Sequence, residues 1–243
     1  MARARAERWA AALCVTVVVG ACPVVGGCGG EPEREAPRAA ETSGQERAEP
    51  EPMEVEGLMG TIPERKIHAT LEPKLGRFQR CFFHGAEEVE LIGGDFEFYF
   101  RVGLDGRVEW VYPRRSTVGH RATEKCLLEE AARVRFPEPQ GGGAAELAWG
   151  FGLDPAAGRP PVAWEPSRVA EVVASEGPDV VDACGGGSFQ VTVYVAPGGQ
   201  VMAAGAAVDD PESAEHIDCV VEAVRGWSMP DPGSYAAKVS FEL

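Results

Sequence analysis

The sequence predicts an α+β fold made of two tandem units. Each unit is expected in the order helix, strand, strand, helix, strand, with a three-stranded antiparallel sheet covered by two helices. One observation behind this prediction is a repeat, because the chain resembles itself at an offset of 93 residues. The other is periodicity, since segments of period two alternate with segments at helical spacing in both copies. With 243 residues, 44% of them apolar, the chain is long enough for two small cores.

The repeat is clearest at the first strand of each unit. The segment FEFYFRVGLDGRV, beginning at Phe96, aligns with FQVTVYVAPGGQV, beginning at Phe189, and the same offset aligns Cys126 with Cys219 without a gap. Ten additional residues, within the stretch HGAEEVELIGG, precede the strand of the first copy, and we expect them to form a loop. We interpret the pattern as a duplicated module.

Three strands are expected in each unit. The predicted strands span 96–102, about 107–112 and 147–153 in the first unit, and 189–195, about 200–206 and 239–243 in the second. Gly106 and Gly199 stand in the turns between the first two strands, where residues that tolerate positive φ favour a hairpin.

A helix is predicted before and after each hairpin. The leading helix of the first unit opens at Thr61 and Glu64, which have the spacing of a capping box. Pro73 is expected to kink or split this helix, and Gly177 with Pro178 to interrupt its counterpart in the second unit. The later helix of each unit is expected to end before a proline.

The first 27 residues have the pattern of an export signal. Three arginines precede an uncharged stretch from Trp9 to Gly27 that ends in small residues. Val25 to Cys28 resembles a bacterial lipobox, which predicts lipidation of Cys28; Cys22 is the alternative, because a similar motif ends there. A short membrane anchor is the alternative for the whole stretch, although glycines and a proline interrupt it.

Residues 28–60 are predicted to be a disordered acidic tether. From Gly29 to Gly60 there are nine acidic and three basic residues, four prolines and no apolar period. The predicted domains follow as a first unit at 61–158, a linker at 159–165 and a second, divergent unit at 166–243.

The cysteines predict one disulfide inside each unit. The chain has seven cysteines and no CxxC pair. The repeat selects Cys81 with Cys126 and Cys184 with Cys219, because only this pairing keeps each bridge within one copy. A zinc site using the four thiolates and free buried thiols are the alternatives, and the isolated spacing of each cysteine disfavours zinc.

The first unit resembles the AgmX/PglI C-terminal domain, a TonB-C-like module. The matching residues include Cys81 followed by an aromatic residue, the turn at Asp105 and Gly106, Cys126, and the pair Phe136 and Pro137. The second unit departs further and is assigned to the family mainly through its similarity to the first. The resemblance implies a non-enzymatic envelope module with a helix-backed antiparallel sheet, and TonB-like relatives dock partners through a sheet edge.

Composition and spacing exclude several function classes as first interpretations. With 38 acidic and 23 basic side chains the formal charge is −15, which disfavours nucleic-acid binding. No nucleophile motif, phosphate-binding loop or helical histidine pair is present in the sequence, so we predict no catalytic residue, no metal site and no cofactor.

Charge distinguishes the two units. The first has 13 basic and 15 acidic side chains between Thr61 and Gly158, whereas the second has 3 and 12 between Arg168 and Leu243. In the first unit Arg114, Arg115 and Arg121 follow the predicted second strand. They are candidates for binding an anionic partner, and a solvated loop is the alternative interpretation.

Together these features predict a non-enzymatic, lipid-anchored binding or scaffold protein of the cell envelope. We expect it at the outer membrane, facing the periplasm, with a protein partner bound at a sheet edge, for which the third strands are the candidates. A role in an envelope or gliding-motility type machinery would follow from the resemblance. The alternatives are a periplasmic thiol-disulfide or other envelope enzyme, and a purely structural lipoprotein whose two units bury each other's edges.

Overall fold

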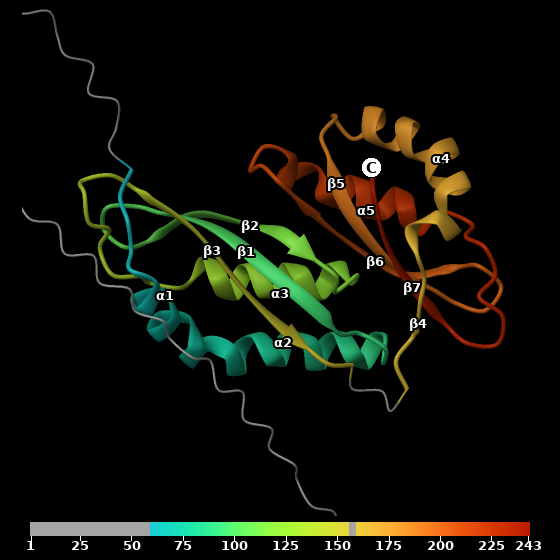
Figure 1. Ribbon diagram of the computed structural model, residues 1–243, viewed down its shortest axis with the longest axis horizontal. Coiled ribbons are helices and arrows are strands. Elements are labelled where there is room, and N and C mark those ends of the chain that lie inside the picture. Colours follow the sequence, from blue (N-terminus) through green and yellow to red (C-terminus); the bar gives the residue numbers. More distant parts are fainter. Residues whose placement is uncertain (1–58, 156–158) are drawn as a thin grey trace, which may run out of the picture. The chain divides into compact units, whose positions relative to one another are not determined.

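The computed structural model describes residues 59–155 and 159–243 (Figure 1). They belong to one compact unit that spans Met53–Leu243. The predicted signal peptide, the two candidate lipidation residues Cys22 and Cys28, and the tether up to residue 58 lie outside the described residues. Within the described ranges no helix is both long enough and apolar enough to cross a membrane.

The fold is mixed α+β with antiparallel sheets, and the predicted order of elements occurs twice. The first half contains α1 (Glu64–Leu71), a 3-10 turn η1 (Glu72–Lys74), α2 (Leu75–Glu88), β1 (Gly94–Val102), β2 (Val108–Ser116), α3 (Arg121–Ala132) and β3 (Ala145–Leu153). The second half contains β4 (Val162–Ala163), η2 (Pro166–Arg168), α4 (Ala170–Ala183), β5 (Phe189–Val195), β6 (Val201–Val208), η3 (Ser213–His216), α5 (Ile217–Arg225) and β7 (Ala237–Glu242).

Each half has its own sheet. The first sheet has the strand order β2-β1-β3, and all its pairs are antiparallel. The second has the order β4-β7-β5-β6, in which β4 adds to β7 in parallel and the other pairs are antiparallel. The sequence did not predict β4, which lies in the expected linker.

The hairpin turn is built in the same way in both halves. Gly106 has φ 77° and Gly199 has φ 84°, the left-handed region that favours glycine. The carbonyl of Gly106 accepts a hydrogen bond from the Phe136 amide at 2.9 Å, and that of Gly199 accepts one from Met229 at 2.8 Å. A Cβ at either glycine would collide with the carbonyl of the facing residue. Glycine is therefore required twice, once for the turn and once for this close approach.

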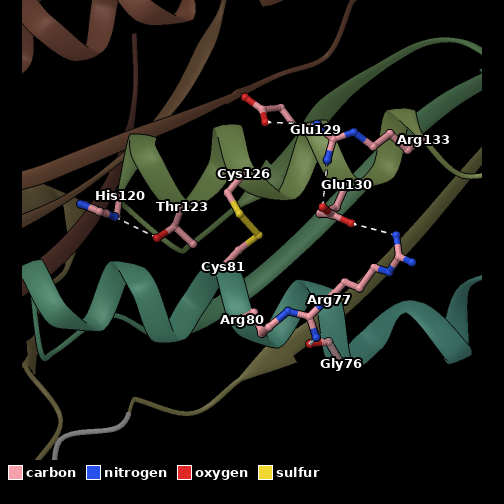
Figure 2. The surroundings of a disulfide bond; sticks show 10 residues. All are labelled: Gly76, Arg77, Arg80, Cys81, His120, Thr123, Cys126, Glu129, Glu130 and Arg133. Carbon is pink, nitrogen blue, oxygen red and sulfur yellow. Dashed lines mark hydrogen bonds and ion pairs between the residues drawn. A yellow bond between two sulfur atoms is a disulfide. The ribbon is translucent and has the colours of Figure 1, made fainter.

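A disulfide joins the two helices that cover each sheet. Cys81 of α2 is bonded to Cys126 of α3 (Figure 2), and Cys184, directly after α4, is bonded to Cys219 of α5. These are the pairs that the repeat predicts. On the solvent side of the first pair, Arg77 Nη1 lies 3.4 Å from Glu130 Oε2, which adds an exposed ion pair between α2 and α3.

Of three predictions about the helices, one is confirmed and two are wrong. The capping box is wrong, because Thr61 exchanges main-chain hydrogen bonds with Gln140 and α1 begins after Pro63 without a side-chain cap. Pro73 does split the first helix, at η1. Pro178 does not interrupt α4. The preceding Gly177 has no Cβ to clash with the proline ring, so the helical conformation continues.

Two segment boundaries also differ from the predictions. The insertion expected as a loop begins within α2, which continues to Glu88. The second strand of the first hairpin ends at Ser116, later than expected, so Arg114 and Arg115 lie within β2 and do not follow it. A register shift in the β1–β2 pairing passes over Arg114, whereas the β5–β6 pairing has no shift at the corresponding place.

The halves meet around one buried carboxylate. Glu124 of α3 is fully buried; its carboxylate accepts hydrogen bonds from the Ser116 hydroxyl at 2.6 Å and from the Ala206 amide of β6 at 3.2 Å. Burial raises the pKa of Glu124, while these hydrogen bonds and Arg121 oppose that shift. Gly205 leaves the space that the carboxylate occupies, because a Cβ there would collide with it.

Removing a disulfide is expected to destabilise the fold. Replacing Cys184 and Cys219 by serine should lower the free energy of unfolding by about 2–4 kcal/mol, because the open loop regains conformational entropy in the unfolded chain. Urea denaturation of the oxidised proteins measures this loss. Reductant should lower the stability of the wild type by more than that of the double variant, and unchanged variant stability would contradict the expectation.

Gly205→Ala is expected to destabilise the contact between the halves by about 1–3 kcal/mol, because the added methyl group displaces Glu124. Gly76→Ala is the matched control, since a Cβ at this position in α2 meets nothing within 4 Å and alanine favours the helix. Thermal unfolding of the two variants should therefore shift in opposite directions. Equal shifts would show that Glu124 does not constrain the interface.

Candidate functional site

The candidate site is the outer edge of β3. This strand ends the first sheet, where it pairs with β1 on one side only. At its beginning the Ala144 carbonyl accepts a hydrogen bond from the Gly60 amide at 2.9 Å. From Glu146 to Leu153 the described residues supply no hydrogen-bond partner to the main chain on the outer side of the strand. These main-chain groups are free to pair with another extended chain.

The other strand edges of the described sheets are covered at least in part. The β4 segment covers the start of β7 through Val162 and Trp164, whose amides each donate at 2.9 Å. The edge strands β2 and β6 lie between the two halves, where the Ser116 carbonyl accepts the Thr192 hydroxyl at 3.1 Å and Glu124 binds the Ala206 amide. The strand that contains the predicted edge at 239–243 is therefore partly covered, because β4 pairs with its first two residues, Ala237 and Lys238. In β3 the contact at Ala144 leaves the longer stretch from Glu146 to Leu153 open.

Three hollows surround the last residues of β3. The Phe83 hollow, about 120 Å³, lies between α2 and the end of the strand and is lined by Phe82, Phe83, Ile92 and Leu153 among others. The glycine hollow, about 470 Å³, lies on the opposite face and includes Gly150 and Gly152. The Lys238 hollow, about 620 Å³, lies between the strand end and β7. All three adjoin the segment from Gly150 to Asp154.

The Phe83 hollow is lined mainly by apolar side chains, with Gln79 and Asp154 as its polar residues, and lies on the open side of the sheet. On α2, Phe83 follows Cys81 by two residues, about 200° around the helix, so it faces away from α3, to which Cys81 is bonded. Its exposed fraction is 63%, whereas the neighbouring Phe82 is buried and packs on Phe151 with ring centroids 6.2 Å apart. Phe83 thus extends the apolar face of the sheet beyond β3.

The glycine hollow is acidic. Gly150 pairs with Glu97 and Gly152 pairs with Asp95 across the β1–β3 ladder, and a Cβ at Gly152 would collide with the Asp95 carboxylate. Within the described ranges the Asp95 carboxylate has no ion-pair partner, and Glu97 Oε1 lies 3.8 Å from Arg114 Nε. Arg115 lines the same hollow. The two carboxylates therefore border the edge of β3 with no side chain of β3 in front of them.

The Lys238 side chain, which lines the Lys238 hollow, already has partners for its ammonium group within the protein. Lys238 Nζ donates a hydrogen bond to the Gly93 carbonyl at 2.7 Å and lies 5.2 Å from the centre of the Tyr194 ring. Burial lowers the pKa of Lys238 to about 8, with Asp95 opposing the shift. The Tyr194 hydroxyl also bonds to Gly93, at 3.1 Å. These contacts tie the segment before β1 to the second sheet.

The structure separates the three arginines proposed as an anion site. Arg114 is half-buried and stacks its guanidinium 4.9 Å from the centre of the Tyr99 ring, and Arg115 is exposed. Arg121 begins α3, where its Nε lies 2.7 Å from Asp218 Oδ1 and its side chain is largely covered. Arg121 thus links the two halves, and the candidate patch narrows to Arg114 and Arg115.

The described cysteines and the buried His120 are bonded within the protein. All four described cysteines are in disulfides. Buried His120 contacts Thr123 at 2.9 Å and Glu88 at 3.3 Å, and burial lowers its pKa. Across the described ranges no group of three or more His, Cys, Asp or Glu side chains is arranged to hold a metal ion.

The sequence predicts the β3 segment but not the side chains that lie on its two faces. The run WGFG at 149–152 alternates large residues that face the core with glycines. This alternation indicates a strand that has no side chains at the glycine positions on the face away from the core. The position of Phe83 beyond the sheet edge depends on how α2 packs. Asp95 and Glu97 reach the glycines only through strand pairing.

Comparison of the chain with protein-family models, with curated proteins and with solved structures found no significant match. Membership of the AgmX/PglI domain family therefore stays a prediction from the sequence.

Proposed function

We propose that this chain is a non-enzymatic cell-envelope binding or scaffold protein that receives an extended segment of a protein partner along β3. The observation that carries the proposal is the unpaired outer edge of β3 from Glu146 to Leu153. An added strand would satisfy these main-chain groups, and the side chains on both faces would set its register. The flanking hollows support the proposal because they provide space on both faces for partner side chains.

Features of the N-terminus support an envelope location. The predicted lipid on Cys28 would attach the chain to the outer membrane, and the acidic tether would hold the folded part away from the bilayer on the periplasmic side. Two disulfides are consistent with folding in an oxidising compartment. In this proposal the folded part consists of two tandem TonB-C-like units, and the resemblance to the AgmX/PglI family suggests an envelope or motility-type machinery.

Site-specific photo-crosslinking tests the proposal. With benzoylphenylalanine in place of Ala148, an exposed residue in the middle of β3, the full chain expressed in its native envelope should form an adduct with a protein partner. The same probe in place of Met202, exposed on β6, is the matched control and should form none. Hydrogen exchange of the isolated adduct should show protection of β3 amides relative to the free protein.

Adducts of equal yield at both positions, or a partner that leaves β3 amides unprotected, would refute edge recognition. Protection of free β3 comparable to that of the central strand β1 would also refute it, because the edge would then already be covered.

A further inference from the structure

From the two faces of β3 we infer that the segment it receives alternates apolar with basic side chains. The apolar residues would lie on the α2 side against Phe83, and the basic residues would lie over Gly150 and Gly152 and meet Asp95 and Glu97. This inference rests on the proposed function and deepens it by naming the chemistry of the partner.

The alternation follows from strand geometry. Successive side chains of an added strand point to opposite faces of the sheet, so every second residue shares the face of Phe151 and Leu153. That face is the one covered by α2, where Phe78 stacks on Phe151 with ring centroids 5.3 Å apart. A partner residue on this face, beside Leu153, reaches the Phe83 hollow. Burial against Phe83 and Leu153 favours a branched aliphatic or aromatic side chain there.

The opposite face selects charge because β3 has glycine at positions 150 and 152, where no side chain covers the carboxylates of β1. Strands lie about 4.8 Å apart, so an added strand is about 10 Å from β1, with only glycine between a partner residue and Glu97 or Asp95. A lysine or arginine side chain is long enough to cross a glycine and reach the carboxylate beyond it. A shorter or acidic side chain would leave the carboxylates unpaired or repelled.

The charges around the glycine hollow favour a cation. Asp95 has no ion-pair partner among the described residues, and Asp154, at the end of β3, adds a third acidic group to the adjoining hollows. Opposing positive charge comes from three side chains. Arg114 Nε lies 3.8 Å from Glu97 Oε1, Lys238 donates its hydrogen bond to Gly93, and Arg115 is the basic side chain that lines the glycine hollow with Asp95 and Glu97.

Fluorescence anisotropy with three labelled peptides tests the inference on the oxidised full chain. The first peptide has the sequence Lys-Val-Lys-Phe-Lys-Val-Lys, the second has glutamate in place of every lysine, and the third has the composition of the first with the lysines grouped at one end. We expect the first peptide to bind at least tenfold more tightly than the other two. The third peptide controls for attraction to the net charge of the chain.

Two variants locate the binding. Asp95→Asn with Glu97→Gln should weaken the first peptide about threefold to tenfold and reduce the salt dependence of binding. The matched control, Glu212→Gln with Glu215→Gln, removes two exposed carboxylates on the second half and should leave the affinity unchanged. Phe83→Ala should weaken binding about fivefold, whereas Leu104→Ala, equally exposed in the first hairpin turn, should have no effect.

Three results would overturn the inference: equal binding of all three peptides, tighter binding of the glutamate peptide, or no binding of the alternating lysine peptide. Equal losses in the matched control variants would do the same. The crosslinking experiment at Ala148 uses the native partner and does not depend on its charge. It therefore decides separately whether β3 receives a strand at all.

Discussion

The need of main-chain amides and carbonyls for hydrogen-bond partners governs this structure. A sheet of three strands has two edges, and each edge must be covered by protein, by water or by another chain. Here β2 and β6 are turned toward each other, and the interface supplies substitutes such as the Glu124 carboxylate, which binds a β6 amide. Among the described residues the outer edge of β3 has no hydrogen-bond partner from Glu146 to Leu153, and the proposed function follows from this open edge.

The two halves share their plan but differ in what they leave accessible. Both have a hairpin, two helices joined by a disulfide, and a returning third strand. In the second half the preceding linker supplies β4, which adds in parallel to the start of the third strand, and in the first half the matching contact is a single parallel bridge between Gly60 and Ala145. The open face of the second sheet is also buried, because Tyr194 and Ala203 pack into the core of the first half. The two halves thus differ in how much of their sheets the rest of the protein covers.

Alternation and repetition predicted the strands, the hairpins, the helix order and the disulfide pairs, because these depend on periodicity and on residues close in the sequence or equivalent in the two copies. The errors occur where distant residues intervene. Thr61 has the sequence of a cap but pairs with Gln140, and Arg121 looks like part of a surface patch but is bound by Asp218 of the other half. The prediction of a break at Pro178 is wrong for a local reason, since Gly177 has no Cβ to clash with the proline ring.

The candidate site shows the same division. The sequence by itself determined that 147–153 is a strand with one apolar face and glycines on the other, because side-chain period and glycine content are local properties. Only the tertiary structure decided that this strand ends its sheet, that its counterpart does not, and that Phe83 and two carboxylates flank it. The order of strands in a sheet and the orientation of a helix depend on packing between segments that are distant in the sequence. The burial of apolar surface that drives this packing is non-directional, so the sequence does not specify which apolar surfaces meet.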